Sequence, residues 1–202
     1  MDVAVGLVQT YLRVNGYFTV TEFPVVEAIG GGGYRAATDI DVLGCRFPSV
    51  ADGGVGAQGR SASVDPALEI PLQSVDMIVG EVKESEAAFN APGLRRDVLA
   101  TTLARFGCCP VDHAEVLVTD LLATGHSTTP GGHHVRLVAF GATPAGTRRY
   151  TSLPLPQVVT FLEGYVRQNW QALKTIPSKD PALGWLILRE KLRLAGEPGA
   201  GH

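Results

Sequence analysis

The sequence predicts an α/β or α+β protein in which helices pack on a mixed β-sheet. Three observations lead to this prediction. The 202 residues fit one domain, the 45% share of hydrophobic residues is enough for a core, and segments of helical and strand periodicity follow one another along the chain. The expected order is a helix, three strands, a helix, two strands and two closing helices.

The amino-terminal part of the chain predicts one helix and a β-hairpin. A helical apolar stripe begins at Val3 and ends at the helix-terminating pair Asn15-Gly16. β-Branched and aromatic residues then predict a strand over residues 17–29, and four consecutive glycines form a turn before the antiparallel partner at 35–47. Glycines and prolines predict an irregular excursion at 48–75, before a third strand at 75–84.

The carboxyl-terminal part is mainly helical. Apolar residues at helical spacing predict a helix over 94–106, whereas residues 115–123 match helix and strand templates equally poorly and stay undecided. Strands are expected at 134–142 and 150–155, and helices at 157–174 and 181–194. We therefore expect a domain at residues 1–150, with a helical extension at 151–202 packed on it.

Composition narrows the class of protein. The apolar stretches are shorter than a membrane span, and the amino terminus lacks the pattern of a secretion signal. Three cysteines, two of them adjacent, do not make a closed disulfide framework. These features predict a cytoplasmic protein that does not enter the membrane.

The net charge of −3 divides into −7 for residues 1–93 and +4 for residues 94–202, so one acidic half is joined to one basic half.

Acidic side chains gather on two of the expected strands. In the first, alternation places Asp39 and Asp41 on one face and Ile40 and Val42 on the other. In the second, Glu81 and Lys83 share a face opposite the apolar residues. If the two strands are neighbours, these acids stand side by side.

This pairing suits a hard cation. Mg²⁺, or Mn²⁺ in its place, prefers oxygen ligands, and Asp41 and Glu81 supply two carboxylates while the carbonyl of Val82 could add a backbone oxygen. Lys83 lies near enough to orient or help deprotonate an attacking water and to neutralise charge on a phosphate. The four residues predict a site for phosphodiester hydrolysis.

These segments resemble a known family, the restriction-endonuclease-like PD-(D/E)xK nuclease superfamily, over about residues 3–142. The resemblance rests on four features: the helix ending at Gly16-Tyr17, the hairpin through Phe23-Pro24, the Asp39-to-Leu43 strand and the Glu81-Val82-Lys83 strand. It implies an α-β-β-β-α-β core and a metal-dependent nuclease, acting on DNA or, as the less favoured substrate, RNA.

The resemblance also implies residue roles. Asp41 would be the first metal-binding acid, Glu81 the second and Lys83 the catalytic lysine, with Asp39 as an auxiliary acid. Many members of the family place a glutamate on the first helix, and this chain has Gln9 at about that position. Gln9 is therefore the expected auxiliary residue on that helix.

The predicted partner is nucleic acid. Arg95, Arg96 and Arg105 lie on one face of the 94–106 helix and would contact the phosphate backbone, although an exposed basic helix face explains them equally well. An alternative function is a catalytically inactive nuclease-fold module in a protein assembly or homo-oligomer. Gln9 in place of an acid and the pI of 5.9 favour that alternative.

Other motifs have simpler interpretations. The glycines at 30–33 are typical of a flexible hairpin tip, because no helix or Lys-Ser/Thr pair follows them as in a phosphate-binding loop. Cys108, Cys109 and the four histidines between 113 and 134 lack the spacing of a zinc site. The aromatic residues of the two closing helices are interpreted as core or oligomer contacts rather than platforms for nucleobases: Phe161, Tyr165, Trp170 and Trp185.

Overall fold

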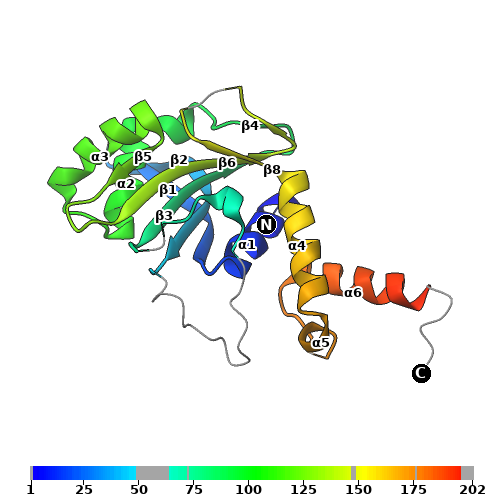
Figure 1. Cartoon of the computed structure of the whole chain (residues 1–202). Helices are drawn as coiled ribbons and strands as arrows, with labels where there is room; N and C mark the ends of the chain where they lie inside the picture. Colours follow the sequence, from blue (N-terminus) through cyan, green and yellow to red (C-terminus); the bar gives the residue numbers. More distant parts are fainter. Residues whose placement is uncertain (1, 49–63, 72, 147–148, 176, 197–202) are drawn as a thin grey trace.

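A computed structural model describes residues 2–48, 64–71, 73–146, 149–175 and 177–196. The chain forms a mixed, curled sheet with helices on both faces (Figure 1). The strand order is β1-β2-β3-β6-β5, and β8 also pairs with β6. The predicted class, a mixed sheet flanked by helices, is confirmed.

The first three elements follow the expected order. They are α1 (Val3–Val14), β1 (Phe18–Ile29) and β2 (Gly33–Arg46). The Asp2 side chain caps α1 by accepting a hydrogen bond from the Ala4 N–H, and the helix ends at Asn15 as predicted. The two strands pair antiparallel around a turn in which Gly31 and Gly32 adopt positive φ angles. Of the expected excursion, residues 49–63 and 72 lie outside the described residues, and the remainder contains the short 3₁₀ helix η1 (Pro66–Leu68).

The central strands join the two halves of the molecule. β3 (Asp76–Val82) pairs antiparallel with β2 and parallel with β6 (His134–Gly141). Between them lie β4 (Glu86–Ala87), η2 (Pro92–Leu94), α2 (Arg96–Phe106), α3 (Val111–Thr124) and β5 (His126–Thr128). The undecided segment at 115–123 is thus helical.

The carboxyl-terminal elements complete the sheet and one helical layer. They are β7 (Thr143–Pro144), β8 (Thr151–Pro154), α4 (Leu155–Gln168), α5 (Trp170–Leu173) and α6 (Pro181–Ala195). β8 runs parallel to β6, and β7 pairs with β4. The single helix expected at 157–174 is divided at Asn169 into α4 and α5. No helix among the described residues is long and apolar enough to cross a membrane.

Two buried clusters fill the faces of the sheet. One packs α1, α4 and α6 against Val42, Ile78 and Val82, and the other packs α2 and α3 against Ile40 and Leu43. The expected alternation, with Ile40 and Val42 on one face, is therefore wrong. Glu22, which would face Asp41 in the β1–β2 register, has a φ of 52°, and this left-handed residue coincides with the change of face.

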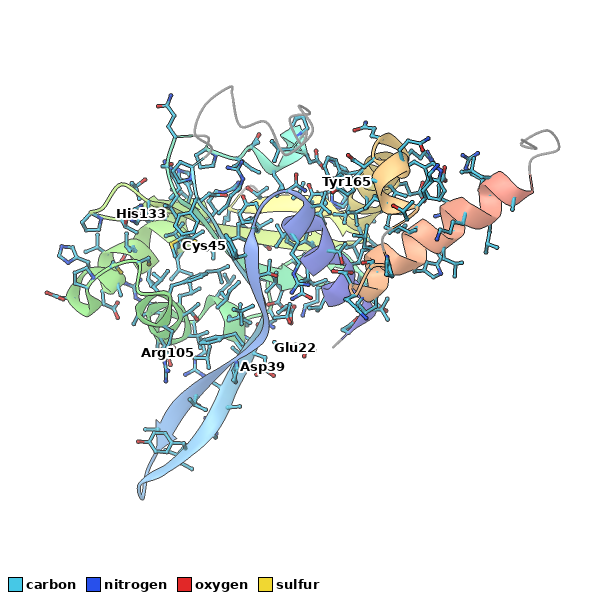
Figure 2. The ribbon with its side chains drawn as sticks, turned by 90° about the horizontal axis from the view of Figure 1, so that it is seen from below. Glu22, Asp39, Cys45, Arg105, His133 and Tyr165 are labelled. Atoms are coloured by element: carbon cyan, nitrogen blue, oxygen red, sulfur yellow. The ribbon has the colours of Figure 1, made fainter. Side chains whose placement is uncertain are left out.

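The distal part of the hairpin leaves the sheet. β2 is paired with β3 over Val42 to Arg46, so the remainder of β1 and β2 forms a two-stranded ribbon. Figure 2 shows this ribbon projecting from the body, with Glu22 and Asp39 near the point where it departs. The backbone pairing of β2 with β3 therefore ends before the carboxyl end of β3.

Candidate functional site

The site is formed where β2 separates from β3. The last paired residues are Val42 and Gly80, and one step further along the same register Asp41 stands opposite Glu81. The separated strand no longer offers a backbone acceptor to Val82. The Asp41 carboxylate takes that place, because its Oδ2 accepts a hydrogen bond of 2.7 Å from the Val82 N–H. The end of the strand pairing thus holds Asp41 in position.

Glu81 is the most buried acid of the site, with 1% of its surface exposed. Its Oε1 atom accepts a hydrogen bond of 2.7 Å from Asn90 Nδ2 and forms an ion pair with Lys83 Nζ. Its Oε2 atom is buried without a hydrogen-bond partner. An unsatisfied buried carboxylate oxygen is costly, so this atom has the chemistry of a ligand for a cation.

The Val82 carbonyl points toward the same place. The Lys83 N–H donates to the Phe140 carbonyl of β6 at 2.8 Å. In a trans peptide the carbonyl points opposite to the following N–H, so the Val82 oxygen is directed away from β6 and toward β2. Because Asp41 lies on that side, the predicted backbone ligand fits the two carboxylates.

Burial dominates the electrostatics of both acids. Loss of water around Asp41 raises the pKa of its carboxyl, against the opposing effects of the Val82 N–H and the Lys83 charge. Burial likewise raises the pKa of Glu81; the Lys83 hydrogen bond opposes this, and the charge of Asp41 adds to it. The two carboxylates therefore repel one another across the strands, and a divalent cation would relieve that repulsion.

Asn90 and Gly93 support Glu81 and were not identified from the sequence. Asn90 Oδ1 accepts a hydrogen bond of 2.6 Å from the Gly93 N–H while its amide nitrogen holds Glu81. A Cβ atom at position 93 would lie 3.0 Å from Asn90 Oδ1 and 3.5 Å from Glu81 Oε2. The turn-forming sequence Asn90-Ala91-Pro92-Gly93, soon after Lys83, was the available signal.

The auxiliary residues lie in different surroundings. Asp39 is exposed on β2, and its charge is among those that raise the pKa of Asp41. Gln9 is buried and lines an apolar groove between α1, α4 and α6. Asp2, which caps α1 and was not singled out from the sequence, also acts electrostatically on Asp41. Asp2 is thus the acid of this helix that acts on the site.

The three arginines of the 94–106 segment are exposed, and two of them are engaged with acids. Arg95 Nη2 pairs with Glu27 at 2.6 Å and also with Asp97. Arg96 Nη2 lies 3.3 Å from Glu115 Oε2. Arg105 is near the carboxyl end of α2 and is labelled in Figure 2. Much of this positive charge is therefore locally balanced.

Within the described residues, no group of three or more His, Cys, Asp or Glu side chains could hold a metal ion. The candidate described above differs from such a group, because it combines two carboxylates with a backbone carbonyl. Cys108 and Cys109 are free thiols at the α2–α3 connection, with their sulfur atoms 4.0 Å apart. Burial raises the pKa of Cys108 to about 12, which keeps this thiol protonated.

Comparisons with protein-family models, with curated proteins and with solved structures found no match to this chain.

Proposed function

We propose that this protein is a metal-dependent nuclease that hydrolyses phosphodiester bonds, with DNA as the favoured substrate. The observation that carries the proposal is the buried, unpartnered Oε2 atom of Glu81 beside Asp41 and Lys83. One acid, a second acid and a lysine at the separated ends of two strands form the set of groups that such a reaction uses.

The order of elements also supports a restriction-endonuclease-like core. α1, β1, β2, β3, α2 and β6 follow in the α-β-β-β-α-β order, with α3 and β5 added before β6. The parallel pairing of β6 with β3 agrees with a crossover through the α2–α3 layer. In this proposal the added α3 and β5 leave Glu81 on β3 and Lys83 directly after the end of that strand.

Asp41 Oδ1, Glu81 Oε2 and the Val82 carbonyl would hold Mg²⁺ or Mn²⁺. When bound, the cation supplies Lewis-acid activation of water and of the phosphate. Lys83 donates from its ammonium group to Glu81 Oε1, which keeps the charge beside the reacting phosphate. Asn90 fixes the Glu81 carboxylate, so that Oε2 stays directed to the cation.

The test is cleavage of linear and circular DNA by the full chain with Mg²⁺ or Mn²⁺. We expect Asp41→Ala and Lys83→Ala to lower the rate by at least about 100-fold. Asp112→Ala, which removes an exposed acid of α3, is the matched control and should cleave as the unchanged protein does. Equal cleavage by all four proteins would exclude the site.

A second candidate function is a catalytically inactive nuclease-fold subunit of an assembly. Its support is the engagement of Arg95 and Arg96 with Glu27, Asp97 and Glu115, which leaves less positive charge for a polyanion. Calorimetric titration with Mg²⁺ and Mn²⁺ separates the two functions. Heat that is lost in Glu81→Gln supports the nuclease, whereas no binding of either ion supports the inactive subunit.

A further inference from the structure

Helix α6 carries apolar side chains on two opposite sides. Leu186 and Ile187 are buried against the cluster that includes α1 and α4. On the other side, Trp185, Leu188 and Leu192 have 58%, 52% and 65% of their surfaces exposed. A helix that is apolar on both sides is normally covered on both sides. The second side of α6 therefore has the composition of a contact surface.

The exposed residues follow the spacing of a coiled-coil seam. Five exposed positions succeed one another at intervals of four, three, four and three residues: Pro181, Trp185, Leu188, Leu192 and Ala195. These are the intervals of a and d positions, which face a partner helix. The seam spans about 21 Å of helix. In Figure 1, α6 extends away from the sheet.

An apolar groove adjoins the amino-terminal end of the seam. The groove has a volume of about 520 Å³ and lies between α1, α4 and α6. Its apolar lining includes Val3, Leu7, Pro181 and Trp185, and Val3 is 85% exposed. A ridge of apolar side chains that leads into a groove is the form of surface on which an amphipathic helix docks.

The exposed charged side chains of α6 are basic: Arg189, Lys191 and Arg193. The single acid of the helix, Glu190, is 8% exposed and pairs with Arg193. Arg189 and Lys191 flank the seam at the positions that face charged residues of a partner helix. Arg189 also forms an ion pair with Glu163 of α4, so the basic charge beside the seam comes mainly from Lys191. A second copy of α6 would bring like charges to these positions. An acidic helix would bring opposite ones.

The aliphatic part of the seam also distinguishes a helix from a nucleic acid. Nucleobases stack on aromatic rings, and phosphates pair with basic groups. Leu188 and Leu192 offer neither interaction, and together with Trp185 they are the large exposed apolar side chains of α6. We propose that α6 binds an acidic amphipathic helix of a partner protein along the seam formed by Trp185, Leu188 and Leu192. This proposal does not depend on nuclease activity.

Two synthetic four-heptad peptides, labelled and used at trace concentration, test the proposal with the full chain. Both carry the same leucine stripe, flanked by glutamates in one and by lysines in the other. We expect fluorescence anisotropy to show binding of the glutamate peptide, with affinity about tenfold or more above that of the lysine peptide. Leu188→Glu and Leu192→Glu should each weaken binding by about tenfold or more.

Val116→Glu is the matched apolar control, because Val116 is 62% exposed on α3, away from the seam. Lys191→Glu should reverse the preference between the two peptides, whereas Lys174→Glu, outside α6, should not. Circular dichroism melting confirms that each variant is folded.

Three results would overturn the proposal. One is that neither peptide binds, or that both bind equally. Another is that sedimentation shows a dimer of the chain and that Leu188→Glu dissociates this dimer, which would assign the seam to a second copy of the chain. The third is binding of a single-stranded oligonucleotide that Leu188→Glu abolishes, with no peptide binding, which would assign the seam to nucleic acid.

Discussion

At the scale of single residues, the buried carboxylate of Glu81 has opposite effects on stability and on the proposed function. Its charge lowers the stability of the fold, and the same charge is proposed to bind the cation. Its side chain is 1% exposed, one of its oxygens lacks a partner, and burial raises its pKa. The folded protein therefore holds a proton on this carboxyl more readily than the unfolded chain does. Stability from this group is complete below the ordinary carboxyl pKa of about 4 and is lost as the pH rises through the raised value.

Replacing Glu81 with glutamine should therefore stabilise the protein without metal. We expect Glu81→Gln to raise the free energy of unfolding by about 1 kcal/mol at neutral pH in EDTA, because a buried charge is removed. The gain should vanish in acid, where the native glutamate is neutral. Urea denaturation measures both values. Glu84→Gln, at an exposed position, is the control. A loss of stability at neutral pH would contradict the assignment of Oε2 as an unsatisfied charge.

Asn90 and Gly93 should act on metal affinity through Glu81. Asn90→Ala removes the 2.7 Å hydrogen bond to Oε1, and Gly93→Ala places a Cβ 3.0 Å from Asn90 Oδ1. We expect either change to weaken Mn²⁺ binding in calorimetry by about tenfold or more, as for other residues that orient a ligand. Gly164→Ala is the control, because a Cβ there meets no atom within 4 Å. Unchanged affinity in both variants would show that Asn90 does not position Glu81.

At the scale of elements, the parallel β3–β6 pair is held by a buried ion pair at the end away from the site. Arg136 Nε and Nη2 donate to both oxygens of Asp76, at 2.9 and 2.7 Å, and Nη1 donates to the Leu68 carbonyl at 2.8 Å. Tyr17 also donates its hydroxyl to Asp76. This network links η1, β3, β6 and Tyr17, the residue before β1, and thus fixes the strand that carries Glu81.

Removing only the arginine of that pair should lower the stability of the protein strongly. Arg136→Leu would leave the Asp76 carboxylate, with 0% exposure, without its cation. We expect the free energy of unfolding to fall by about 3–5 kcal/mol in chemical denaturation. Asp76→Asn in the same chain should recover part of the loss. Arg96→Leu, which breaks an exposed pair with Glu115, should cost less than about 1 kcal/mol. Similar losses for the two arginines would refute the argument from burial.

At the scale of the whole molecule, the carboxyl-terminal helices share a core with the first helix. Val158, Leu162 and Val166 of α4 belong to one cluster with Val8 and Leu12 of α1. Val42 and Val82, which are next to Asp41 and Glu81 in the chain, belong to the same cluster. We therefore expect residues 1–150 and the helical extension to unfold together.

Leu162→Ala tests this coupling. Leu162 has 0% exposure, and its truncation should cost about 3 kcal/mol, whereas Leu188→Ala at an exposed position should cost little. Trp170 and Trp185, the two tryptophans of the chain, both lie in the extension, so their fluorescence reports on it. Far-ultraviolet circular dichroism reports on the whole chain. Fluorescence and dichroism transitions at different urea concentrations would show that the two parts unfold separately.

Local patterns of residues predict the helices, the strands and the composition of the candidate site. Periodicity and terminating residues predicted α1 to its end at Asn15, both strands of the hairpin, and β3 with Glu81 and Lys83 at its end. These features depend on neighbours in the chain, because a helix end or an alternating strand is encoded within a few residues.

The way in which these elements meet depends on tertiary contacts. The α3 segment is a helix because its side chains Ala114, Leu117, Val118 and Leu121 are buried in the second cluster, which its ambiguous local pattern does not reveal. Asn90 reaches Glu81 through the fold of a loop, and Ile40 and Val42 lie in different clusters beside Glu22, a strand residue with a positive φ. Trp185, expected as a core or oligomer contact, is exposed at the surface and is therefore not part of the core. Contacts between distant residues, set by packing and burial, determine all of these features.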